Sequence, residues 1–134
     1  MRDWISVRDT GTDLGRGVYA ERSFEQGQIV EVCPVVVLEA ELRSLPEPLR
    51  RIFFNWREGQ YAMALGYGSI YNHADEPNLE FERDFETLVM RFTAVRRIER
   101  GEQLTINYNQ VEAGKHKKKD WFKANQVEKI EIER

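Results

Sequence analysis

Glycine and proline divide this chain into short segments along most of its length. Between these breaks lie runs of four to ten residues that alternate apolar and polar side chains or are rich in β-branched residues. Such a pattern predicts a β-rich domain of small sheets with short helices. The turn signals stand at Gly11, Gly15, Gly17, Gly27, Pro34, Gly59, Gly66, Gly68, Pro77 and Gly101.

The clearest strand-like runs are residues 4–8, 29–38, 88–95 and 104–108. Two segments instead have apolar residues at helical spacing, namely residues 46–56 and residues 117–127, and we expect a helix at each. Pro46 is compatible with the first position of a helix, where the missing N–H has no partner to lose. Asn78 is expected to cap the turn into the strand that follows it.

Length and composition favour one globular domain with one core. The chain has 134 residues, 41% of them hydrophobic, and a formal net charge of −3. A single cysteine, Cys33, forms no disulfide within the chain and supplies no cysteine-rich zinc site, so we expect an intracellular, reducing setting without a metal. The sequence shows no signal core and no apolar run of membrane-spanning length, so no membrane partner is expected.

Three sequence blocks occur in a fixed order along the chain. The first is LGRGVYAERSFEQGQIV at residues 14–30, the second SIYNHADEPN at residues 69–78, and the third GEQLTINY at residues 101–108. An AMALGYG run at residues 62–68 leads into the second block. Each block alone is common, but together they resemble the SET domain, the fold of most protein-lysine methyltransferases, over nearly all of residues 7–109.

The resemblance is closest to minimal viral and bacterial-type SET proteins without cysteine-rich flanking clusters. It implies a mostly β, β-clip-like fold with short helices, in which small sheets surround a knot-like crossing near the C-terminus. Residues 1–134 would form a single SET domain, and residues 110–134 would be an extension that closes the cofactor or peptide site. It also implies S-adenosylmethionine as cofactor and methyl transfer to lysine in a protein substrate, with a histone tail as one candidate.

The same resemblance implies which residues bind the cofactor. Gly15, Arg16 and Gly17 match the first cofactor motif, where small residues allow close backbone approach and an arginine can pair with a carboxylate. Asn72 and His73 match the Asn-His pair that holds the amino group and the adenine. The alternative interpretations are a plain turn at the glycines and a structural histidine. Trp121 corresponds to an aromatic residue that closes the pocket after the last motif.

Tyr108 matches the catalytic tyrosine of the family. A phenol with an ordinary pKa near 10 is a poor base at neutral pH, so orientation and electrostatic stabilisation are the roles expected of it. Tyr67 and Ile106 correspond to positions in the lysine channel, and the apolar Ile106 leaves room for more than one methyl group. Tyr71 is a second channel candidate, for which core packing is the preferred interpretation.

Two other functions remain open from the sequence. A SET-like fold can bind peptides or act as a scaffold without turnover, although the presence of Asn72, His73 and Tyr108 favours an enzyme. The basic run KHKKK at residues 115–119 suggests a nucleic-acid partner, but the net acidity argues against this as the main role. The expected partner is a protein or peptide carrying a target lysine, in the cytoplasm or nucleus, and a homodimer is left open.

Overall fold

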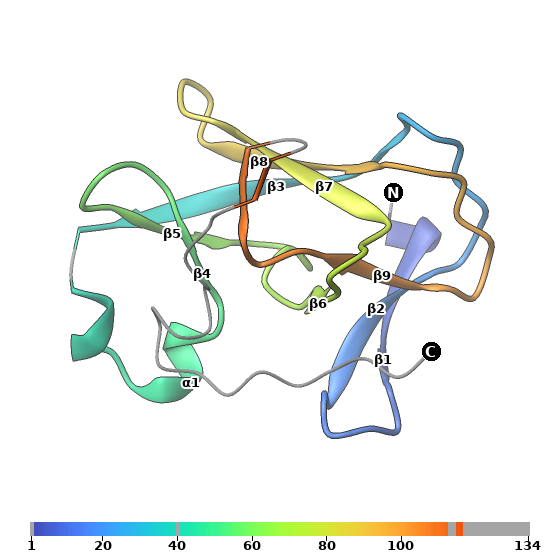
Figure 1. Ribbon diagram of the computed structural model, residues 1–134, viewed down its shortest axis with the longest axis horizontal. Helices are drawn as coiled ribbons and strands as arrows, with labels where there is room; N and C mark the ends of the chain where they lie inside the picture. Colours follow the sequence, from blue (N-terminus) through green and yellow to red (C-terminus); the bar gives the residue numbers. More distant parts are fainter. Residues whose placement is uncertain (1, 40, 113–114, 117–134) are drawn as a thin grey trace.

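The computed structural model describes residues 2–39, 41–112 and 115–116, and these residues form two main sheets and a small hairpin (Figure 1). The first sheet has the strand order β1-β2-β9-β6, and the second has the order β4-β5-β3-β8-β7. The strands are β1 (Ile5–Asp9), β2 (Arg16–Ala20), β3 (Ile29–Leu38), β4 (Phe53–Asn55), β5 (Tyr61–Ala64), β6 (Asn72–His73), β7 (Leu79–Asp84), β8 (Val89–Ala94), β9 (Gln103–Ile106), β10 (Gln110–Glu112) and β11 (Lys115–His116). The helical turns are η1 (Arg2–Trp4), η2 (Leu42–Ser44) and α1 (Glu47–Arg50).

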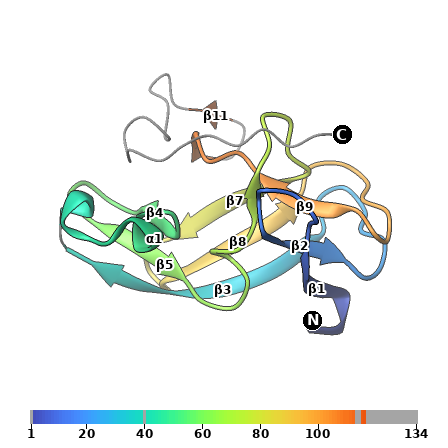
Figure 2. The ribbon, with the colours of Figure 1, turned by 90° about the horizontal axis from the view of Figure 1, so that it is seen from below.

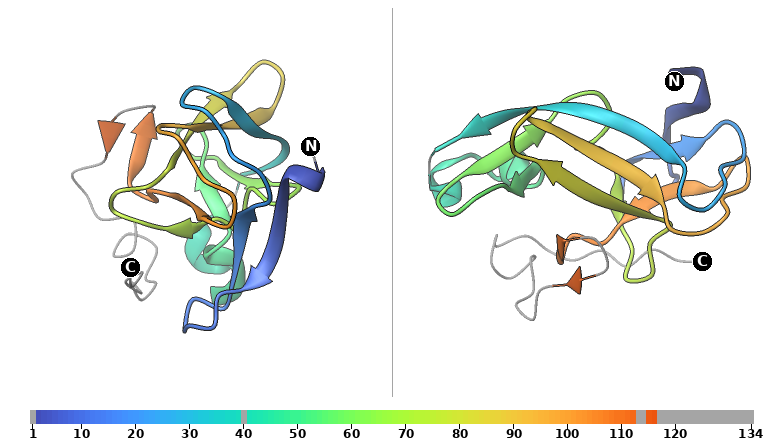
Figure 3. Two further views of the ribbon diagram at one scale, coloured as in Figure 1. Left: turned by 90° about the vertical axis from the view of Figure 1, so that its right-hand side faces the viewer. Right: turned by 90° about the horizontal axis from the view of Figure 1, so that it is seen from above.

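Strand β3 runs along the length of the molecule and organises the five-stranded sheet. Its first half pairs with β8 and its second half with β5, both antiparallel. The β1–β2 hairpin lies near one end of β3, whereas the β4–β5 hairpin and α1 lie at the other, as Figures 2 and 3 show from three directions. A register shift between Ile29 and Glu31 interrupts the alternation of β3, and both Val30 and Glu31 are buried there.

An aromatic cluster fills the space on the inner side of the five-stranded sheet. Phe92 is fully buried, and its ring lies 4.7 Å from that of Tyr71, 6.1 Å from that of Phe81 and 6.4 Å from that of Phe54. Phe81 and Phe92 are directly opposite each other in the β7–β8 register. These rings come from four separate segments, so their packing joins the sheet to the chain that leads into β6.

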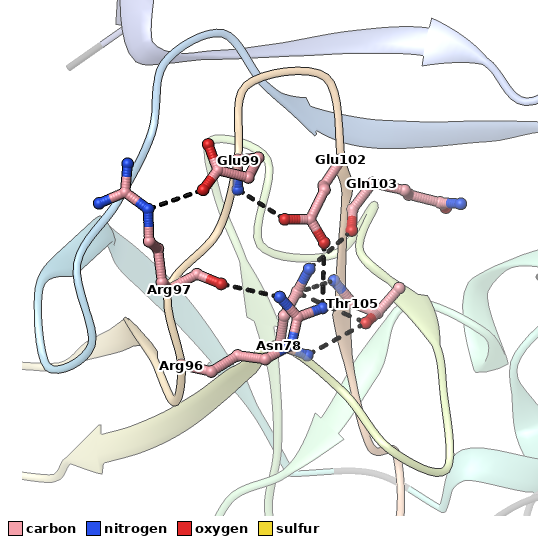
Figure 4. A network of polar contacts seen from close by, with 7 residues as sticks. All are labelled: Asn78, Arg96, Arg97, Glu99, Glu102, Gln103 and Thr105. Atoms are coloured by element: carbon pink, nitrogen blue, oxygen red, sulfur yellow. Dashed lines mark hydrogen bonds and ion pairs between the residues drawn. The ribbon is translucent and has the colours of Figure 1, made fainter.

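The four-stranded sheet depends on buried polar side chains. Its short strand β6 pairs with β9 in parallel, Asn72 with Thr105 and His73 with Ile106. Beside this pair, Asn78 is almost wholly buried, donates from Nδ2 to the Gln103 carbonyl at 2.9 Å, and accepts at Oδ1 from the Thr105 amide at 2.8 Å (Figure 4). The Asn78 side chain therefore bonds the backbone of β9 as a neighbouring strand would, and it does not cap its own turn.

The predicted β-rich fold is confirmed, with one clear error. Residues 29–38 form the predicted strand, and the other three predicted strands appear within about two residues of their expected ends. The predicted helix over residues 46–56 is wrong beyond Arg50, because Phe53–Asn55 pairs with β5 as an edge strand. The helical spacing of apolar residues in this segment did not decide its structure. The backbone N–H and C=O groups of Phe53–Asn55 instead pair with Tyr61–Met63 of β5.

Some predictions fall beyond the described residues. The predicted helix over residues 117–127 lies there, as does most of the basic run, of which the described part, Lys115–His116, pairs with Gln110 and Glu112. The role of residues 110–134 as a closing extension and the knot-like crossing stay predictions. Within the described residues, no helix has both the length and the apolar character needed to cross a membrane.

Candidate active site

The parallel contact between β6 and β9 brings the second and third sequence blocks together. Asn72 and His73 lie on β6, and Tyr108 follows β9 by two residues. Both β6 side chains are largely buried, with 9% of Asn72 and 5% of His73 exposed. Buried polar groups require partners, so the bonds of these two side chains determine what the site offers to a ligand.

Asn72 is bonded only through its amide nitrogen among the described residues. Its Nδ2 donates to the Arg16 carbonyl at 3.0 Å and to Gln103 Oε1 at 2.8 Å. Both N–H donors are thereby used, and no described residue donates to Oδ1. This oxygen is an acceptor, as required to bind an ammonium group.

His73 is held in one tautomer by its two neighbours. The Tyr108 amide donates to Nδ1 at 3.0 Å, and Nε2 lies 2.7 Å from Asp75 Oδ1. Because an amide nitrogen can only donate, Nδ1 is unprotonated and the proton is on Nε2. The ring also meets that of Tyr108 edge to face at 5.2 Å. His73 thus fixes the backbone and ring at Tyr108, which is a structural role, and its cofactor-binding role stays a prediction.

Tyr108 points its hydroxyl into the protein. Its Oη donates to the Tyr71 carbonyl at 2.7 Å. Burial raises the pKa of Tyr108 above its ordinary value of 10.0, against a smaller lowering by the positive charge of Arg51. The phenol therefore stays protonated at neutral pH, and it can orient a neighbouring group but not remove a proton.

A narrow pocket opens beside Tyr108. Its volume of about 20 Å³ holds roughly one water molecule, so it admits only a thin chain end. Aromatic and aliphatic walls favour an alkyl stem and disfavour a charge. The lining residues are Arg51, Ile52, Phe53, Phe54, Gly68, Ser69, Tyr71 and Tyr108.

A second and larger hollow lies elsewhere. Its volume is about 460 Å³, and its walls include Glu31, Leu65 and Tyr67. Glu31 is buried, accepting at Oε2 from the Tyr67 amide at 2.9 Å and at Oε1 from the Tyr71 hydroxyl at 2.7 Å. Desolvation and the Glu31 charge raise the pKa of Tyr71 well above its ordinary value. The Tyr71 hydroxyl therefore keeps its proton and donates a hydrogen bond to the Glu31 carboxylate.

The structure brings some of the predicted site residues together. Gly17 lies against Asn72, and Arg16 contributes its backbone carbonyl while its side chain is exposed. Gly15 stands at the turn before β2 with φ +75° and open space where a side chain would be, and its backbone is bonded to Thr10 and Thr12 of the same turn. The cofactor roles of all three residues stay predictions.

Of the remaining predicted residues that the structure describes, only Tyr71 lines the narrow pocket. Tyr67 lines the larger hollow, and Ile106 is fully buried in the core, so neither is among the residues that line the pocket beside Tyr108. Tyr71 is buried, as expected for a core residue, and it also lines that pocket. Trp121 lies outside the described residues. The channel and cofactor roles of Tyr67, Ile106 and Trp121 remain predictions.

The sequence interpretation missed six pocket residues, among them Gly68 and Ser69, and one polar partner. The helix expected over residues 46–56 included four of them, so that they were not considered as a pocket wall: Arg51, Ile52, Phe53 and Phe54. Gln103 was not singled out, although strand alternation within GEQLTINY puts Gln103 on the same face as Thr105. No cluster of three metal-ligating side chains occurs within the described ranges.

Comparison with known proteins gives a consistent result. The SET domain family profile matches residues 15–109. A Schizosaccharomyces pombe histone-lysine N-methyltransferase, specific for lysine 37 of histone H3, is 31% identical over 111 residues, which cover 81% of this chain and 75% of that protein.

Two solved structures share the fold. One is a Plasmodium falciparum protein studied as a candidate histone methyltransferase, with a TM-score of 0.65 and 26% identity over 81% of this chain and 95% of that one. The other is a humanized mutant of the Chaetomium thermophilum Polycomb Repressive Complex 2 bound to an inhibitor. It has a TM-score of 0.66 and 20% identity over 81% of this chain and 15% of that one, which shows likeness of fold alone.

Proposed function

This chain belongs to the SET domain family, and from that premise we propose that it transfers a methyl group from S-adenosylmethionine to the side-chain amine of lysine in a protein substrate. The observation that carries the proposal is the narrow aromatic pocket that ends at Tyr108, next to the buried Asn72–His73 pair. A pocket of this width suits an amine on an alkyl stem, and the adjacent polar pair suits the amino-acid part of the cofactor.

The chain's own residues fit the cofactor in two respects. Asn72 Oδ1 is an acceptor without a described donor, so it can bind the ammonium group. The exposed Arg16 guanidinium, at the start of β2, can pair with the carboxylate. When bound, the cofactor supplies a sulfonium-activated methyl group.

In the reaction, the lysine nitrogen forms the new bond to the methyl carbon while the bond from that carbon to sulfur breaks. The products are a methylated amine and S-adenosylhomocysteine, and one amine proton is released to solvent. Tyr108 contributes by orientation, since its hydroxyl is anchored on the Tyr71 carbonyl and stays protonated. The apolar walls exclude water from the reacting atoms and favour the neutral amine.

For the substrate, the family and the fission-yeast relative support a histone tail, and we propose it as the first substrate to test. Such a substrate implies an intracellular location that includes the nucleus in a eukaryotic host.

The test is calorimetric titration with S-adenosylhomocysteine, followed by methyl incorporation into histone peptides. We expect one-site binding that Asn72→Ala weakens, and methylation of at least one peptide. Tyr108→Phe should reduce turnover by about 10²–10³-fold, on the order found when one preorganised polar group beside the reacting atoms is removed, with little change in cofactor affinity. Tyr61→Phe, on β5 and outside the pocket, is the matched control.

The outcomes separate the candidate functions. Binding of S-adenosylhomocysteine without methylation of any peptide would favour a peptide-binding module. Full activity of Tyr108→Phe would remove Tyr108 from the reaction. The absence of cofactor binding at millimolar ligand concentration would contradict the proposed function as a whole.

A further inference from the structure

The two positions of the first cofactor motif are occupied by glycine for different structural reasons. Gly15 has φ +75° and open space around it, so its conformation requires glycine. Gly17 lies in β2 opposite Arg8, and its φ is not in the left-handed region. A Cβ on Gly17 would lie 2.5 Å from Gln103 Oε1 and 3.0 Å from Asn72 Nδ2. Glycine at position 17 therefore leaves the space that this pair of amides occupies, and a side chain there would displace the Gln103 amide.

The Asn72 amide has its orientation set by two acceptors. The Arg16 carbonyl and Gln103 Oε1 each accept one of the two Nδ2 hydrogens. A flipped amide would direct Oδ1 at both of these oxygens and lose both bonds. The Arg16 carbonyl belongs to the backbone, so no substitution removes it. The Gln103 side chain is the acceptor that a substitution can remove.

Gln103 is held firmly at its own backbone. The Gln103 carbonyl accepts a hydrogen bond from Asn78 Nδ2, and Gln103 is the register partner of Tyr19 in β2. Figure 4 shows the Gln103 side chain extending away from Asn78, and its Oε1 lies 2.8 Å from Asn72 Nδ2. The strand thus presents a side-chain acceptor to Asn72 from a position that Asn78 and β2 fix.

We propose that Gln103 is a positioning residue that turns the Asn72 carbonyl oxygen toward the ammonium group of the cofactor, and that Gly17 is glycine to leave room for this contact. The inference rests on the proposed function, because it deepens the role of the same site. It predicts that position 103 needs an acceptor of glutamine length. Glutamate keeps such an acceptor, whereas methionine keeps the length and loses it.

The first experiment compares Gln103→Met, Gln103→Glu and the native protein by calorimetry with S-adenosylhomocysteine. Gln103→Met should weaken binding by about 10–100-fold, because a misoriented Asn72 amide loses its hydrogen bond to the charged ammonium group. Gln103→Glu should restore affinity to within a few-fold of native. Gln26→Met, at an exposed turn before β3, is the matched control and should bind as the native protein does.

A second ligand separates positioning from a general structural effect. The analogue of S-adenosylhomocysteine that lacks the α-amino group cannot use Asn72 Oδ1. Its affinity should therefore be the same for Gln103→Met and for the native protein. Equal weakening of both ligands by Gln103→Met would overturn the proposal, as would native affinity of this variant for S-adenosylhomocysteine. Failure of the native protein to bind S-adenosylhomocysteine would instead overturn the proposed function, and this inference with it.

The role of Gly17 is tested by a double-mutant cycle. Gly17→Ala should weaken S-adenosylhomocysteine binding in the native background, because its methyl group displaces the Gln103 amide. In the Gln103→Ala background the Gln103 amide is gone and only the 3.0 Å approach to Asn72 Nδ2 remains, so Gly17→Ala should add a smaller loss than it does in the native background. Additive losses would show that Gly17 acts independently of Gln103 and would overturn this part of the proposal.

Discussion

The two main sheets of this protein are held together by different interactions. The five-stranded sheet covers a cluster of aromatic rings centred on Phe92, and its strands all pair antiparallel. The four-stranded sheet ends in a two-residue parallel pair that buried amide side chains support. Apolar burial is tolerant of small shifts, whereas a hydrogen-bonded amide has one correct orientation. The sheet that needs exact geometry is the one that carries the Asn-His pair.

Phe92→Ala should give the largest loss of stability. Removing a fully buried ring from the centre of the aromatic cluster costs about 3–5 kcal/mol of unfolding free energy. Urea denaturation followed by tryptophan fluorescence measures the loss. Because Asn72 is held by Arg16 and Gln103 of the four-stranded sheet, the variant that remains folded should bind S-adenosylhomocysteine with near-native affinity, although Phe92 also packs on Tyr71. If the affinity falls by more than the fraction of unfolded protein accounts for, the five-stranded sheet also supports the ligand site, and the distinction between the two sheets is wrong.

Asn78→Ala should cost a comparable amount of stability and affect the ligand more. It leaves the Gln103 carbonyl and the Thr105 amide without their buried partner, and such groups cost about 1–3 kcal/mol each when unpaired. The freed β9 no longer fixes Gln103 against Asn72. We therefore expect weaker S-adenosylhomocysteine binding under conditions where the variant is fully folded, measured by calorimetry. Native affinity would show that β9 keeps its position without Asn78.

Alkaline pH should destabilise the five-stranded side first. Burial raises the pKa of the Cys33 thiol and of Tyr71 above their ordinary values of 9.0 and 10.0. The protonated groups are thus favoured in the folded state, so their contribution is complete below pH 9 and is lost as pH rises beyond it. Denaturation midpoints from pH 7 to 11 should fall from about pH 9, and Cys33→Ala should move this onset toward pH 10. A flat profile would contradict the burial of both groups.

Arg97→Ala should have the smallest effect. Arg97 bonds Glu25 and Glu99, and all three side chains are more than half exposed. Solvent screens such pairs, so we expect no measurable change in the denaturation midpoint or in cofactor affinity. Figure 4 draws the exposed Arg97–Glu99 pair and the buried Asn78–Thr105 contact together, and the exposed pair serves as the comparison for the Asn78 variant. A large effect of Arg97→Ala would mean that the loop before β9 also supports the site.

Much of the architecture could be predicted from the sequence. The ten-residue strand at Ile29–Leu38 follows from its β-branched composition, and the alternation of residues 88–95 gives β8. The order of the three blocks identified the family before the fold was known. Local patterns report which side of a strand faces solvent and where the chain turns, so these features can be found without knowing the tertiary structure.

The remaining features required the folded chain. Helical spacing over residues 46–56 could not exclude an edge strand, since pairing with β5 depends on residues that follow it in the sequence. Burial of Glu31 depends on a register shift in β3, and its partners, Tyr67 and Tyr71, lie 36 and 40 residues away.

The candidate site shows the same division. The sequence by itself determined that Asn72, His73 and Tyr108 belong to one pattern, because these motifs are continuous in the chain. Only the tertiary structure decided that Gln103 orients the Asn72 amide and that Asn78 bonds β9, because a hydrogen bond has direction and its partners are here more than twenty residues apart. No periodicity in the sequence records which distant acceptor a buried amide meets.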